Sequence, residues 1–201
     1  MLAGLLDEAG ISMGDKFLPP DENNPTGYWE DEDFLWINRG LLEHCRGSWK
    51  EPPSRKDVRD GMIKFDNITN ITISRKERKH GKKLWGWKDP RSCLTIHAME
   101  YLLNTPRYII LDRNDNAIIS SLLISHGGSD VAWKKLLSIY RHRINSFIMN
   151  EGPKFVRFTY ESFVNKETQE KTLTDLAGFI DIEPTDLLRC SGFIKTKNDL
   201  A

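Results

Sequence analysis

Apolar residues recur at helical spacing along most of the chain. Between residues 2 and 10 they occupy positions 2, 5, 6 and 9, the i, i+3, i+4, i+7 pattern of a helix with one buried face. Similar spacing predicts further helices over residues 31–46, 91–103, 115–126, 130–149 and 168–180. Proline, glycine and asparagine predict connections over residues 18–28 and 47–60. Residues 56–79 leave open a helix or an irregular segment.

Three short apolar runs interrupt these helices, at residues 84–87, 108–111 and 155–158. Runs of this kind are typical of buried strands. Strands that alternate with helices predict an α/β fold with a parallel sheet. Because ligands of such sheets bind beyond the carboxyl ends of the strands, the residues after each run are the first candidates for chemistry.

Basic residues follow the first two predicted strands. Lys88 and Arg91 follow the first strand, within the sequence Lys-Asp-Pro-Arg. Arg113 follows the second, and Ser121 lies eight residues later in the predicted helix. Cations, a hydroxyl and a helix N-terminus together suit a phosphate or sulfate group. The alternatives are an ordinary charged turn at 88–91 and a local cap in which Arg113 pairs with Asp115.

The third predicted strand runs into Tyr160 and Glu161. Glu161 is placed to cap the segment that follows. An amphipathic helix is predicted shortly afterwards, over residues 168–180.

The composition agrees with one soluble globular domain. The chain has 201 residues, a mass of 23.2 kDa and 39% apolar residues, and its 29 basic and 29 acidic residues cancel. The neutral balance argues against a globally basic nucleic-acid binder. No run approaches the ~18 apolar residues of a membrane span. Three cysteines without a Cys-x-x-Cys pair favour a reducing, cytoplasmic compartment and argue against a zinc site.

The charges are nevertheless unevenly distributed. Residues 17–38 contain six acids and no lysine or arginine, whereas residues 75–83 contain six bases. The acids are Asp21, Glu22, Glu30, Asp31, Glu32 and Asp33, and the bases are Arg75, Lys76, Arg78, Lys79, Lys82 and Lys83. Such runs are usually solvated surfaces. The alternative is an acidic wall that faces a basic, anion-holding wall.

The order of these motifs resembles that of the nucleotide-dependent sulfotransferases, in the branch similar to bacterial and tyrosylprotein enzymes. Lys88-Asp89-Pro90 matches the family's Lys-Asp-Pro after a strand. Arg113 and Ser121 match its 3′-phosphate signature, and Tyr160-Glu161 matches its late Tyr-Glu pair. Residues 17–31 resemble the loop that carries an acidic catalytic residue. The likeness covers most of residues 1–182.

The resemblance implies a fold. It implies one domain over residues 1–201, built as a P-loop-NTPase-like three-layer sandwich with a parallel central sheet. The family's opening strand and Pro-x-Ser-Gly-Thr-type loop, which holds the 5′-phosphosulfate, has no counterpart in these residues. We therefore expect an N-terminally truncated sheet with a gap, filled by a homo-oligomer or by closer pairing of neighbouring strands.

The resemblance also implies a reaction and residue roles. The co-substrate would be 3′-phosphoadenosine 5′-phosphosulfate, without a metal, and the acceptor a small molecule, saccharide or peptide. Glu30 would be the catalytic base and Lys88 would neutralise charge on the leaving nucleotide. The nucleotide contacts would come from Arg91, Arg113, Ser121 and Tyr160. Asp31 and Asp33 are alternative bases, and the alternative role for Glu30 is to cap the helix predicted at 31–46. The contrasting hypothesis is a non-catalytic nucleotide-binding or interaction protein that keeps the fold.

Overall fold

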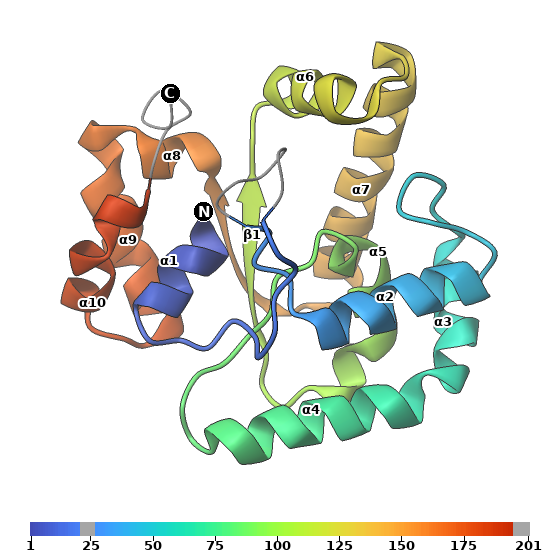
Figure 1. Ribbon diagram of the computed structural model, residues 1–201, viewed down its shortest axis with the longest axis horizontal. Coiled ribbons are helices and arrows are strands. Elements are labelled where there is room, and N and C mark those ends of the chain that lie inside the picture. The colour runs from blue at the N-terminus through green and yellow to red at the C-terminus, as the bar shows by residue number, and fades with distance from the viewer. Residues whose placement is uncertain (21–26, 195–201) are drawn as a thin grey trace.

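The protein is mostly helical, with a small sheet at its centre (Figure 1). The computed structural model describes residues 1–20 and 27–194. Its helices are α1 (Leu2–Glu8), α2 (Glu32–His44), α3 (Arg55–Gly61), α4 (Asp66–His80), α5 (Ser92–Met99), α6 (Asp115–His126), α7 (Asp130–Glu151), α8 (Tyr160–Val164), α9 (Lys166–Ile180) and α10 (Pro184–Arg189). Short 3-10 turns lie at Met62–Lys64, Glu100–Leu102 and Ser191–Phe193. The predicted α/β class is confirmed at this level.

The sheet within these residues has two parallel strands, β1 (Arg107–Asp112) and β2 (Lys154–Thr159). Arg107 pairs with Lys154 and Asp112 with Thr159, so the strands run in register to their carboxyl ends. Two of the three predicted strands are therefore confirmed. Residues 113 and 160 follow directly, which places the predicted Arg113 and Tyr160 side by side.

The strand predicted at residues 84–87 is wrong. This segment forms only an isolated parallel bridge between Trp85 and Ser12, supported by a 2.9 Å hydrogen bond from Gly86 N to Ser12 O. Its aromatic side chains stack instead on Phe34 of α2, with ring centroids 6.2 Å away for Trp85 and 3.9 Å away for Trp87. Ring stacking partly buries the two tryptophans, while Leu84 is 40% exposed, so the segment packs without a strand ladder along its backbone.

The helix predictions hold closely. Helices cover most of each predicted range, although the range 91–103 divides into α5 and a 3-10 turn. The open stretch at 56–79 is helical, since α3, a 3-10 turn and α4 follow one another there. Ser54 starts α3 by accepting a 3.0 Å hydrogen bond from Asp57 N.

Apolar clusters lie on the two faces of the sheet. One joins α2, α3, α4, α5 and α7 and receives Tyr108, whose ring meets Phe147 edge-on at 5.1 Å. The other joins α1, α8, α9 and α10 and receives Ile109. Neighbouring strand residues point to opposite faces, so β1 contributes to both clusters. Figure 1 shows the two groups of helices on either side of β1.

Candidate functional site

A buried carboxylate meets two cations where α2 begins and α5 begins. Glu30 is only 4% exposed. Its Oε1 accepts a 2.9 Å hydrogen bond from Lys88 Nζ, and its Oε2 accepts a 3.0 Å bond from Arg91. Lys88 Nζ also donates to the carbonyl of Tyr28 at 3.1 Å. The structure thus brings together three of the six residues expected in the site.

The two cations differ in how they meet solvent. The side chain of Lys88 is 41% exposed, whereas that of Arg91 is 22% exposed and also contacts Asp89 at 2.8 Å. Burial tends to lower the pKa of Arg91, but Asp89 and Glu30 outweigh burial and raise it. Lys88 is the cation of this cluster that a ligand reaches most directly.

A second set of buried polar residues holds this cluster from behind. Asp89 is 6% exposed and accepts a 2.9 Å hydrogen bond from Asn38 of α2. Burial raises the pKa of Asp89, while Arg91 and Asn38 act in the opposite direction. Asn38 also accepts a 2.6 Å bond from Thr95. These contacts tie α2 to the start of α5 and fix the direction of Arg91.

Glu30 does not cap α2, so that alternative is wrong. The neighbouring Asp31 is the N-cap, and its Oδ1 accepts from Asp33 N at 3.1 Å and Phe34 N at 3.4 Å. A side chain that reaches across to Lys88 and Arg91 cannot also bond the first helical turn. The consecutive residues Glu30 and Asp31 therefore serve two different clusters.

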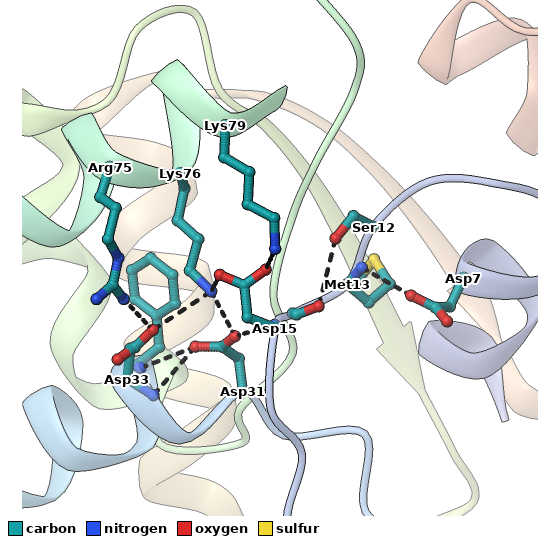
Figure 2. Close-up of polar contacts among 11 residues, drawn as sticks. Asp7, Ser12, Met13, Asp15, Asp31, Asp33, Arg75, Lys76 and Lys79 are labelled. Atoms are coloured by element: carbon teal, nitrogen blue, oxygen red, sulfur yellow. Dashed lines mark hydrogen bonds and ion pairs between the residues drawn. The ribbon is translucent and has the colours of Figure 1, made fainter. Parts of the chain in front are cut away.

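Asp31 and Asp33 belong to an ion-pair cluster with the basic end of α4 (Figure 2). Lys76 is 2% exposed, and its Nζ lies 2.7 Å from Asp31, 2.9 Å from Asp15 and 3.4 Å from Asp33. Arg75 pairs with Asp33 as well. Both alternative bases are thus engaged in holding α4 against α2.

The charge runs can be interpreted either as solvated surfaces or as an acidic segment that faces a basic one. These contacts favour the second interpretation. Lys79 of the basic run also pairs with Asp15. The hydrogen bond from Lys79 lowers the pKa of Asp15 to about 2. Burial tends to lower the pKa of Lys76, but Asp31 and Asp15 outweigh burial and raise it. Two acids of the run, Asp21 and Glu22, lie outside the described residues.

A second candidate cluster lies at the carboxyl ends of the strands. The Arg113 guanidinium sits over the Tyr160 ring, 4.9 Å from its centroid. Glu161 accepts a 3.0 Å hydrogen bond from Asn114 N, which lowers the pKa of Glu161. Glu161 thereby links the ends of β1 and β2.

The predicted cap between Arg113 and Asp115 is wrong. Asn114 caps α6 by accepting from Ala117 N at 3.2 Å, and Asp115 pairs with Arg141 of α7. Because other residues take both tasks, Arg113 is left to lie over Tyr160 and near Glu161, whose pKa its charge helps to lower.

Ser121 stands apart from Arg113 in the described contacts. It is half-buried on α6, and its carbonyl accepts a 2.9 Å hydrogen bond from Ser125. Within residues 1–20 and 27–194, no side-chain hydrogen bond joins Ser121 to Arg113. Among the residues expected to contact the nucleotide, the side chain that lies against Arg113 is that of Tyr160.

The start of α5 lies between the two clusters. Cys93 is close enough to Asp89 and to Asp112 for both carboxylates to act on it, and burial together with these charges raises its pKa to about 12. Such a thiol stays protonated and is a poor nucleophile. Cys93 is half-buried, and a packing role fits it better than a nucleophilic one.

A cavity of about 240 Å³ adjoins Arg91. It is lined by Arg39, Leu42, Glu43, Ser48, Trp49 and Arg91. Sequence patterns did not indicate Arg39 or Trp49, which lie on a helix face and in a connection without any motif. Asn38 was missed too, although a polar residue on the apolar face of α2 was a usable signal.

No protein-family model, curated protein or solved structure matches the chain. Among the described residues, none of the helices has the length and apolar character needed to cross a membrane. The same residues contain no group of three or more histidine, cysteine or acidic side chains placed to hold a metal ion.

Proposed function

We propose that the chain is a sulfotransferase-like protein that takes a sulfuryl group from 3′-phosphoadenosine 5′-phosphosulfate. The observation that carries the proposal is that Lys88 and Arg91 both donate hydrogen bonds to Glu30. In the sequence, Lys88 lies 58 residues and Arg91 61 residues after Glu30. A carboxylate that can accept a proton stands there beside a partly exposed cation that can meet an anion. The sequence resemblance implies the same roles for Glu30 and Lys88, and it implies a nucleotide contact for Arg91.

The proposed fold is the P-loop-like three-layer sandwich of this family. The parallel register of β1 and β2 and the helices on both faces of the sheet support it. In such sheets ligands bind beyond the carboxyl ends of the strands, where Arg113 and Tyr160 lie. A guanidinium there suits a phosphate, so Arg113 would hold the 3′-phosphate, with Ser121 and Tyr160 beside the nucleotide.

The residues of this chain would act mainly by charge and position, as proteins do in phosphoryl transfer. The nucleotide supplies the sulfuryl group. Glu30 would accept the proton of the acceptor hydroxyl or amine, a contribution of about 10²–10⁴-fold in rate. Lys88 would neutralise the charge that develops on the departing phosphate. Arg91 would hold Glu30 in place while Asp89 holds Arg91.

The first test is calorimetric titration with 3′-phosphoadenosine 5′-phosphate. We expect micromolar binding, and we expect Arg113→Ala to weaken it more than tenfold, because a charge-assisted contact is lost. Arg189→Ala is the matched control, since this arginine lies on α10 and is 77% exposed. Absence of binding by the unaltered chain would overturn the proposal.

One observation favours a second candidate, a non-catalytic protein that binds the nucleotide. Both oxygens of Glu30 already accept hydrogen bonds from cations, so this carboxylate also has a purely structural role in holding Lys88 and Arg91. The variant Glu30→Gln separates the two candidates. For an enzyme, it should abolish sulfuryl transfer and leave nucleotide binding nearly unchanged. Nucleotide binding without any transfer by the unaltered chain would favour the second candidate.

A further inference from the structure

Helix α4 is held firmly on one side and is open on the other. Its buried residues are Thr69, Thr72, Ile73 and Lys76, and Lys76 is the centre of the ion-pair cluster with α2. Figure 1 shows α4 along the lower edge of the molecule, with the other labelled elements above it. The outward side of α4 is therefore available to a partner.

A stripe of residues follows the open side at alternating steps of four and three. Ile68, Ile71, Arg75 and Arg78 lie on α4 itself, whereas Lys64 lies in the preceding 3-10 turn and Lys82 follows the end of the helix. We call these six residues the α4 stripe. Ile68 and Ile71 are each 51% exposed. After Lys64, the stripe thus has two adjacent apolar side chains and then continues into basic ones.

Most of the charge on this surface is uncompensated. Arg75 and Lys79 have the acidic partners Asp33 and Asp15. Across residues 1–20 and 27–194, by contrast, no ion pair engages the exposed Lys64, Arg78, Lys82 and Lys83. Arg78, Lys82 and Lys83 lie at or just beyond the C-terminal end of α4, Lys64 lies before its first residue, and such cations without acidic partners attract an anionic surface.

We propose that the α4 stripe docks on an anionic phospholipid surface. Basic side chains meet lipid phosphates and carboxylates, while isoleucines on the same stripe enter the boundary between headgroups and acyl chains. A soluble polyanion would use the cations equally well, but it would leave the two exposed isoleucines without a role. The combination of both residue types therefore favours lipid over a polyanion.

The geometry sets the character of this contact. α4 spans 15 residues and buries its opposite side in the protein, so it lies along the surface and does not enter the bilayer. With two isoleucines and four unpaired cations, the contact depends on anionic lipid and weakens as salt rises. It does not depend on nucleotide binding at Arg113.

The test is co-sedimentation of the full chain with vesicles of phosphatidylcholine, alone or mixed with phosphatidylserine. We expect binding only to the mixed vesicles and its loss at high salt. Arg78→Glu/Lys82→Glu should lower the partition coefficient more than tenfold, because each basic residue near such a surface contributes about fivefold. Ile68→Ser/Ile71→Ser should lower it severalfold. The control Lys135→Glu/Lys166→Glu makes the same change of net charge at exposed positions of α7 and α9 and should bind as the unaltered chain does.

Each outcome decides the proposal. Loss of binding in both test variants, with unchanged melting temperatures, supports lipid docking. Loss in the charge variant alone, with full binding by the isoleucine variant, overturns lipid docking in favour of a polyanion site. Failure of the unaltered chain to bind mixed vesicles also overturns it, whatever its affinity for 3′-phosphoadenosine 5′-phosphate.

Discussion

Replacing Lys76 with methionine gives the sharpest test of how the two charge runs hold the protein together. Lys76 is 2% exposed and its partner Asp31 is 1% exposed. Methionine keeps most of the volume of lysine but removes the cation. The Asp31 carboxylate would then stay buried with only backbone donors, from residues 15, 33 and 34.

The expected loss follows from this geometry. Removing one partner of a buried ion pair costs about 3–5 kcal/mol, because the remaining charge is uncompensated. For a chain of this length that corresponds to a melting temperature lower by roughly 6–20 °C. Restoring neutrality in Lys76→Met/Asp31→Asn should recover a large part of the loss, since asparagine also serves as an N-cap.

The assay is denaturant unfolding of these two variants beside a matched control. Lys79→Met removes a lysine that contacts the same Asp15 but is 56% exposed, so it should cost at most about 1 kcal/mol. A loss below ~1 kcal/mol for Lys76→Met, or equal losses for Lys76→Met and Lys79→Met, would refute the reasoning from burial.

Two further predictions concern α2 and α5. Asn38→Ala should destabilise the protein by about 1–3 kcal/mol in denaturant unfolding, because Asp89 and Thr95 lose a buried partner; an unchanged midpoint would mean that water replaces the amide without loss. Burial lowers the pKa of His97 from its usual 6.5 to about 4. Between these two pH values the unfolded chain binds a proton at His97 that the folded chain does not bind, so the free energy of unfolding falls as the pH drops from 6.5 to 4. The loss is at most about 3 kcal/mol, and thermal unfolding across this range should show a weaker pH dependence in His97→Gln than in the unaltered chain.

Local periodicity predicted most of the helices because the apolar residues of α2, α7 and α9 recur every three or four positions, and this spacing can be recognised in the sequence of each helix alone. Periodicity failed at residues 84–87, where the apolar run contains two tryptophans. Whether such a run joins a sheet depends on a neighbouring strand, and neither neighbour nor ring stacking on Phe34 is visible in the local sequence. Tertiary context overrides strand propensity there.

The candidate site was predictable to different degrees. Family resemblance assigned Glu30, Lys88 and Arg91 to one site, and the structure brings their side chains together. The uneven charge hinted that Asp31 and Lys76 face each other, but a pair 45 residues apart has no local signature. Asn38 is a polar residue on the apolar face of a predicted helix. Its role can be recognised only when the structure shows Asp89 as its hydrogen-bond partner.

The register of β1 and β2 limits how the chain can change in length over evolution. Asp112 lies opposite Thr159, and the next residue on each strand forms the Arg113–Tyr160 contact. One residue inserted in either strand would shift the following side chains by about 3.3 Å and turn them to the other face. Insertions at residues 127–129, between α6 and α7, would leave the register intact. Natural variants of this chain should therefore vary in length at that connection and keep a constant length through residues 107–113 and 154–160.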